Sequence, residues 1–127
     1  MSYSIPNVVT YTFSAIDFGA GNSATAIKAP GGAGDGVILD IGVAVTETFN
    51  QVTTPGYVRI GTASDADAFA QLNMAAAAAT DYFNTQDDTD AIIDQTVPNT
   101  QLEVAFVAPT GGTPAGIGTV NIVIAWS

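Results

Sequence analysis

The chain of 127 residues contains no cysteine and no histidine. Without cysteine it can form no disulfide, no thiolate nucleophile and no thiolate metal site. Without histidine it lacks the usual general base and the commonest ligand of transition metals. Chemistry that depends on either residue is therefore excluded.

Positive charge is almost as scarce. Lys28 and Arg59 are the only basic residues against twelve acidic ones, which gives a net charge of −10. With no basic cluster, the composition argues against binding to a nucleic-acid backbone and to an anionic membrane surface. It favours solubility and mutual repulsion of free copies. We interpret Lys28 and Arg59 as ion-pair partners or interface contacts.

Long hydrophobic stretches are also missing. No apolar run approaches the roughly 18 residues that a membrane-spanning helix needs. The first six residues, Met-Ser-Tyr-Ser-Ile-Pro, show neither the charged nor the apolar region of a signal peptide. We therefore expect no membrane contact and no secretion by a signal peptide.

The familiar glycine motifs of nucleotide binding are incomplete. Gly19-Ala-Gly21 lacks the third glycine of a dinucleotide fingerprint because position 24 is alanine, and Gly32-Ala-Gly34 lacks it as well. No Gly-Lys-Ser/Thr segment and no Gly-x-Ser-x-Gly nucleophile elbow occurs anywhere in the chain. The glycines are best interpreted as turn residues that allow positive φ. The sequence predicts no cofactor and no cofactor-binding residue.

Acidic residues raise two possibilities, and the first is a calcium site. Aspartates gather between residues 81 and 94, where Asp88-Thr-Asp90 supplies one pair of alternating carboxylates. The glycine and the final glutamate of a calcium loop are both absent. The sequence favours a solvated acidic loop, and it explains Asp65 and Asp67 as residues of a helix N-terminus. It predicts no metal site.

The second possibility is a pair of catalytic carboxylates. Glu47 and Glu103 are the only glutamates, and each falls in an expected strand. Glycosidases use two carboxylates at a defined separation, but no spacing rule in this sequence supports such a pair. We predict no catalytic residue, and we expect that the protein is not an enzyme.

The strongest structural pattern covers residues 36–49. Its odd positions are apolar from Val37 through Leu39, Ile41, Val43 and Val45, and its even positions are mostly small or polar. A period of two places these sets on opposite faces of a strand. The segment is therefore predicted to be a long strand with its odd face in the core.

Similar alternation predicts strands near residues 8–18, 23–29, 57–61, 101–107 and 119–126, and a short strand or turn at 91–93. Ile16 and Phe18 break the alternation of the first strand, which indicates a bulge or its end. Ser64 and the following acids predict one short helix over 65–72, and the alanines to 79 fit either a continuation of this helix or a tight turn. Residues 80–90 and 94–98 are expected to be loop.

These elements predict an all-β, jelly-roll-like antiparallel β-sandwich with at most one short helix. Residues 1–7 form an N-terminal arm, and residues 8–127 form a single domain. Trp126, the only tryptophan, is expected in the core or in a subunit contact.

Two further segments suggest a family. They are Val58-Arg-Ile-Gly-Thr-Ala-Ser-Asp-Ala-Asp-Ala-Phe-Ala70 and the stretch from Val104-Ala-Phe-Val-Ala-Pro-Thr-Gly-Gly to Ile124-Ala-Trp126. Together with the central strand they resemble capsid decoration, or cement, proteins of tailed bacteriophages, and especially of cyanophages. The resemblance spans roughly residues 36–126.

The resemblance implies a virion protein that is made in the host cytoplasm and assembles as a homotrimer. Such a protein would lie on the outer surface of an icosahedral capsid, bridge neighbouring subunits of the major capsid protein and stabilise the shell. The family offers no catalytic residue to carry over. An alternative of a different class is a glycan-binding β-sandwich module of a phage tail or collar. Tyr57 and Tyr11 are the aromatic residues that could serve it, although Tyr11 is expected to point inward.

Overall fold

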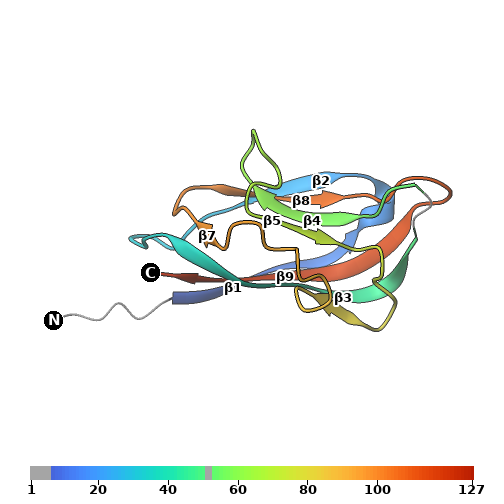
Figure 1. Ribbon diagram of the computed structural model, residues 1–127, viewed down its shortest axis with the longest axis horizontal. Helices are drawn as coiled ribbons and strands as arrows, with labels where there is room; N and C mark the ends of the chain where they lie inside the picture. The colour runs from blue at the N-terminus through green and yellow to red at the C-terminus, as the bar shows by residue number, and fades with distance from the viewer. Residues whose placement is uncertain (1–6, 51–52) are drawn as a thin grey trace.

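The computed structural model describes residues 7–50 and 53–127 as two antiparallel sheets packed face to face (Figure 1). Sheet A contains, in spatial order, β1 (Asn7–Asp17), β9 (Ala115–Trp126), β3 (Gly36–Asn50) and β6 (Tyr82–Asn84), and the short β7 (Thr96–Val97) also pairs with β3. Sheet B contains β2 (Ser23–Ile27), β8 (Leu102–Val107), β4 (Tyr57–Gly61) and β5 (Ala70–Asn73). The predicted arm lies outside the described residues, apart from Asn7, which begins β1.

The connectivity confirms the predicted fold class. Apart from β7, eight strands are divided into two four-stranded sheets whose neighbours are mostly far apart in sequence, in the order β1-β9-β3-β6 and β2-β8-β4-β5. This is the arrangement of a jelly roll. The two longest strands, β3 and β9, pair with each other along most of their length.

One hydrophobic core lies between the sheets. Trp126, Ile122 and Ile124 of β9 and Ile41 and Val43 of β3 are fully buried in it. The buried set of the described residues contains no polar or charged side chain. Trp126 is thus a core residue, one of the two roles predicted for it.

The predicted register of β3 is wrong at its beginning. The pairing with β9 shifts between Ile38 and Asp40, so Ile38 is fully buried whereas Leu39 is 48% exposed and Val37 also faces solvent. Beyond the shift, Ile41, Val43 and Val45 are buried as predicted. A bulge inserts one extra residue and reverses the faces on which the preceding side chains lie.

The predicted helix over 65–72 is not formed. Residues 65–69 form turns, in which the backbone N–H of Thr62 donates to the carbonyl of Asp65. Ala70–Asn73 is strand β5, and it pairs with β4 from Ile60↔Ala70 to Tyr57↔Asn73. The alanines after Met74 lie in turns and irregular segments. Strand pairing with β4 overrides helix propensity here.

Smaller elements were partly anticipated. The bulge expected near the end of the first strand is present between Phe13 and Ile16, and a single 3₁₀ turn, Phe18–Ala20, follows the strand. Ile92 forms an isolated bridge with Ala70, in agreement with the predicted short strand or turn. The strands β6 and β7 lie in segments that were expected to be loops. Within the described residues, no helix is long and apolar enough to cross a membrane.

Candidate functional site

Exposed apolar side chains gather on the outer face of sheet A. Of the five large hydrophobic side chains that are exposed among the described residues, four belong to strands of this sheet: Val8, Val37, Leu39 and Tyr82. Cross-strand pairs share a face of a sheet, and Ala125 of β9 pairs with both Val8 and Val37. We call Val8, Ala125, Val37 and Leu39 the apolar patch.

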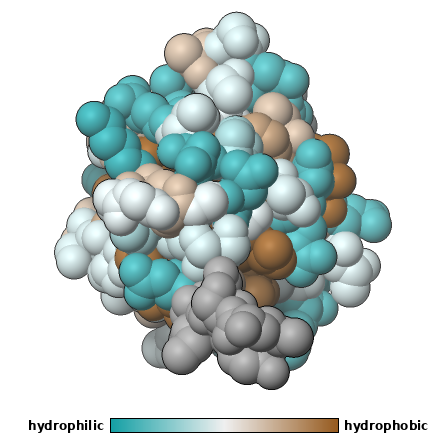
Figure 2. Space-filling view, turned by 90° about the vertical axis from the view of Figure 1, so that its left-hand side faces the viewer, coloured by the Kyte–Doolittle hydropathy of each residue, from teal (hydrophilic) through white to brown (hydrophobic). Residues whose placement is uncertain are grey.

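The apolar patch lies at the end of the sandwich where β1 begins and β9 ends (Figure 1). Figure 2 faces this end and shows hydrophobic surface between larger hydrophilic and neutral areas. Val8 is 58% exposed and Leu39 nearly as much. Grouped apolar surface at one end of a rigid sheet is typical of an interaction site rather than of random exposure.

Charge is distributed unevenly over this face. The patch residues carry none, and in the neighbouring row Thr10 and Val123 are uncharged while Asp40, which pairs with Val123, is acidic. At the opposite end of the same face, Asp17 and Glu47 both pair with Ile117 and are exposed. In a chain of net charge −10, the four patch residues themselves carry no charge, and the half-buried Asp40 is the carboxylate at their border.

A row of polar side chains crosses the middle of the face. Thr12 of β1 donates a hydrogen bond to the Asn121 side chain of β9 at 2.8 Å, and Asn121 is also hydrogen-bonded to the side chain of Tyr82. The hydroxyl end of Tyr82 lies directly over Gly42, where any added Cβ would collide with the ring. Gly42 is therefore required for the aromatic side chain to lie across the sheet.

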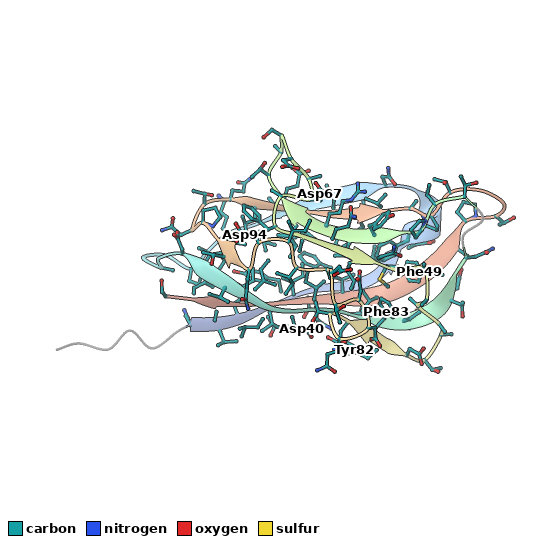
Figure 3. The ribbon with its side chains drawn as sticks, viewed as in Figure 1. Asp40, Phe49, Asp67, Tyr82, Phe83 and Asp94 are labelled. Carbon is teal, nitrogen blue, oxygen red and sulfur yellow. The ribbon has the colours of Figure 1, made fainter. Side chains whose placement is uncertain are left out.

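The environment of Tyr82 also includes an acid. Asp40 accepts a hydrogen bond from Thr85 Oγ1 at 2.8 Å, and both Asp40 and Tyr82 lie on the outer side of sheet A (Figure 3). Burial raises the pKa of the Tyr82 hydroxyl above its usual value of 10.0, and the negative charge of Asp40 raises it further. The hydrogen bond with Asn121 lowers this pKa and so opposes the other two effects.

We expect Asp40→Asn to lower the pKa of Tyr82, because the substitution removes one of the two causes of its increase. Ultraviolet titration of tyrosinate, with Tyr82→Phe to assign the signal, measures this change. The pKa of Tyr82 is higher in the folded than in the unfolded protein, so the folded state binds this proton more tightly. The resulting contribution to the free energy of unfolding is fully present below the unfolded-state pKa of about 10, and it is lost as pH rises through the folded-state pKa. An unchanged titration in Asp40→Asn would show that Asp40 does not act on Tyr82.

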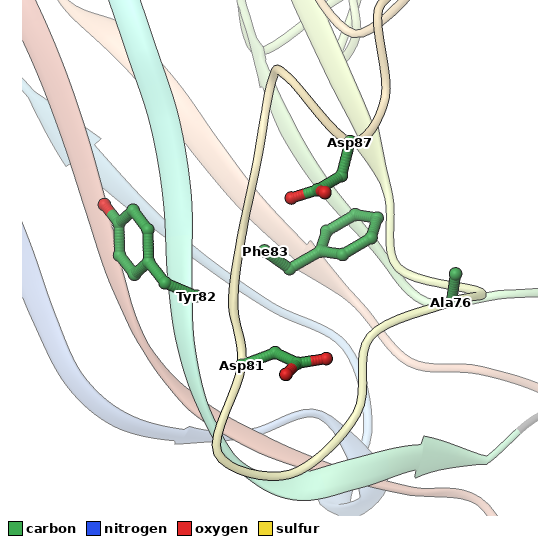
Figure 4. Close-up of a pocket in the computed structure, with 5 residues that line it drawn as sticks. All are labelled: Ala76, Asp81, Tyr82, Phe83 and Asp87. Atoms are coloured by element: carbon green, nitrogen blue, oxygen red, sulfur yellow. The ribbon is translucent and has the colours of Figure 1, made fainter.

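A hollow of about 450 Å³ lies on the other side of β6. Figure 4 shows Phe83, Asp81, Asp87 and Ala76 around it, whereas the Tyr82 side chain points to the opposite side of the strand. The sequence pattern had predicted a loop for both the buried Phe83 and the exposed carboxylates of Asp81 and Asp87.

The aspartates around this hollow shape the backbone. Asp87 accepts a hydrogen bond from the N–H of Asn84 at 3.0 Å, and Asp88 accepts from those of Asn73 at 2.9 Å and Asp90 at 3.3 Å. Such bonds are those of turn-forming Asx residues. Within the described ranges, no group of three or more potential metal ligands comes together. The acidic segment thus has a structural role that the sequence did not reveal.

The other residues discussed from sequence lie apart. Glu47 belongs to β3 in sheet A and Glu103 to β8 in sheet B. Within the described chain, Arg59 donates a hydrogen bond to Gln71 at 2.6 Å and covers the ring of Tyr57 at 4.8 Å, and its expected role in an interface stays a prediction. The backbone carbonyl of Lys28 accepts a hydrogen bond from Tyr11 at 2.9 Å.

The two tyrosines considered for glycan binding are therefore engaged elsewhere. Tyr57 is half-buried under Arg59, and Tyr11 is half-buried with its hydroxyl between Lys28 and Trp126. Tyr82 is the exposed aromatic side chain of the outer face, and sequence reasoning missed it. The only signal for it is the Tyr-Phe pair within the acidic segment.

Comparisons of the chain with protein-family models, with curated proteins and with solved structures found no match.

Proposed function

We propose that this protein is a structural virion protein that decorates an icosahedral phage capsid and bridges neighbouring subunits of its major capsid protein. The observation that carries the proposal is the uncharged apolar patch on the outer face of sheet A. It agrees in direction with the sequence resemblance to capsid decoration proteins. In this proposal the protein contributes contacts and no chemistry.

The physical basis is binding to a site that exists only in the assembled shell. A ligand that binds one state stabilises that state by RT ln(1 + [L]/Kd) per site, and many copies per shell multiply a modest contact. The net charge of −10 makes free copies repel one another. Attachment through the apolar patch leaves the acidic loops in solvent, so binding carries no cost of desolvating their carboxylates.

Particles that lack the protein should lose their contents more readily on heating or osmotic shock, and purified protein should restore their resistance. We expect Leu39→Asp to abolish the restoration, because it places a charge in the contact without disturbing a buried residue. Ile93→Asp is the matched control, since Ile93 is 59% exposed but belongs to the segment beside β5. Equal restoration by both variants would count against the apolar patch.

The alternative is a glycan-binding module of a phage tail or collar, and one observation favours it. Tyr82 lies over Gly42 with about half of its surface open to solvent, and Thr12, Asn121 and Asp40 supply polar groups beside it. An exposed aromatic side chain with adjacent hydrogen-bonding groups is suited to a ligand with one apolar and one polar side. Glycan binding that is lost in Tyr82→Ala, together with particles whose stability does not depend on the protein, would favour this alternative.

A further inference from the structure

The strand edges at the two sides of the sandwich are covered by other segments to different extents. On one side, residues 82–97 cover the sheet edges: β6 and β7 pair with β3, and the N–H of Gln71 in β5 donates to the carbonyl of Ala91 at 2.7 Å. Ile93 donates back to the carbonyl of Phe69 at 2.9 Å. On the other side, β1 and β2 end their sheets, and no other described strand pairs with their outer edges.

The edge of β1 is long and unprotected over its first half. Its register with β9 is regular from Asn7 to Phe13 and shifts before Ile16, where Ala15 has a φ of 49°. Proteins usually protect edge strands with charges, prolines or bulges. The bulge protects the second half, but Asn7-Val-Val-Thr-Tyr-Thr-Phe13 contains no charge, no proline and no glycine.

We propose that this stretch is a self-association edge, at which β1 of one copy pairs antiparallel with β1 of a second copy about a two-fold axis. A two-fold contact uses the same surface twice and closes on itself. With the axis at Thr10, the middle residue, all seven residues find partners. Thr10 then faces Thr10 of the other copy, Val8 faces Thr12, and Val9 faces Tyr11.

Charge does not oppose a second copy at this edge. The chain carries −10, so two copies repel each other over most of their surface. The stretch from Asn7 to Phe13 contributes nothing to this repulsion, and Asp17, the only charged residue of β1, lies beyond the bulge. Backbone hydrogen bonds and the pairing of apolar and Thr side chains then provide the attraction.

The inference goes beyond the proposed function and does not depend on it. It predicts chains in pairs, whereas the sequence resemblance implies a trimer. It also predicts one continuous sheet across the pair, with the outer faces of both copies of sheet A on the same side. Each pair would therefore present two apolar patches to a partner.

The absence of cysteine makes the register directly testable. Opposed residues of antiparallel strands have Cα atoms roughly 4.5–5.5 Å apart, within the range of a disulfide. Under mild oxidation, we expect Thr10→Cys to form a covalent dimer rapidly. Val8→Cys alone should crosslink poorly, because it faces position 12, but an equal mixture of Val8→Cys and Thr12→Cys should crosslink well.

Sedimentation at micromolar concentration provides the second measurement. The unmodified chain should have twice its mass of 12.9 kDa. Thr10→Lys should sediment as a monomer because the axis brings the two lysines together, whereas the control Thr96→Lys, on β7 at the opposite side, should remain a dimer. A monomeric or trimeric unmodified chain, or a dimer in which Thr10→Cys crosslinks no faster than Val8→Cys, would overturn the proposal.

Discussion

Replacing Trp126 by alanine is expected to lower the free energy of unfolding by about 3–5 kcal/mol, the usual cost of removing a buried large aromatic side chain. Trp126 is fully buried near the end of β9, where it pairs with Asn7 on one side and Gly36 on the other. Its ring occupies the space over Gly36 that a Cβ would need. Neighbouring side chains are held by two strands, so they cannot collapse into the space that alanine would leave.

The hydrogen bond of Trp126 is a separate contribution. Its Nε1–H donates to the Tyr11 hydroxyl at 3.0 Å, and that hydroxyl donates to the carbonyl of Lys28. Trp126→Phe retains most of the apolar surface and loses this donor, so we expect a clearly smaller loss than for alanine. Tyr11→Phe removes both hydrogen bonds of this hydroxyl and should cost about 2 kcal/mol, since the typical net value of one hydrogen bond is about 1 kcal/mol. Denaturant midpoints measure all three variants, and a loss below about 1 kcal/mol for Trp126→Ala would contradict the position of Trp126 in the core.

Ile41→Ala is expected to lower the free energy of unfolding by about 2–5 kcal/mol, whereas Leu39→Ala should change it by no more than about 0.5 kcal/mol. Both residues belong to β3 and both are large and aliphatic, but Ile41 is fully buried and Leu39 is about half exposed. The matched pair separates burial from strand propensity. Thermal unfolding should show a large shift for the first variant and almost none for the second.

The same pair tests the bulge in β3. A regular strand would place Leu39 and Ile41 on one face, and both alanine variants would then be severely destabilised. The register shift between Ile38 and Asp40 places them in different environments. Ile38→Ala provides the complement, because Ile38 is fully buried and should resemble Ile41. Equal losses for Leu39 and Ile41 would contradict the shift.

Period-two alternation was sufficient to predict most of the architecture. The inward faces of β4, β8 and β9 are as predicted: Val58 and Ile60, then Leu102, Val104 and Phe106, then the even residues from Val120 to Trp126. β4 and β8 pair in a regular register, and burial alternates without interruption along β9, so alternation along the sequence corresponds to alternation in space. In β3 the bulge depends on pairing with β9, which the local sequence does not specify.

The wrong helix has an instructive cause. A serine followed by acids and a run of alanines predicted it, yet Ala70, Leu72 and Met74 are buried while Gln71 and Asn73 are not. That alternation is visible in the sequence, but it covers only five residues. Local propensity favoured a helix, and pairing of β5 with β4 decided the outcome.

The candidate site was the part least accessible to sequence reasoning. Val37 and Leu39 were assigned to the core because the alternation was taken to continue through the position of the bulge, and Tyr82 was assigned to a loop because β6 has only three residues. The apolar patch brings together residues from the beginning of β1, the end of β9 and the beginning of β3. Such a surface is specified by long-range pairing, which composition and periodicity do not contain.

Co-sedimentation with expanded empty capsids tests the proposed function most directly. Under the proposal the capsids are those of the virus in whose shell the protein would lie, and the measurement would be made at physiological salt and at about 1 M salt, where charge contacts are screened within roughly 3 Å. The account predicts that the protein pellets with capsids at both salt concentrations, that Leu39→Asp stays in the supernatant, and that Ile93→Asp pellets normally. A protein that stays in the supernatant with intact capsids, or a Leu39→Asp variant that pellets as well as the unmodified chain, would contradict it.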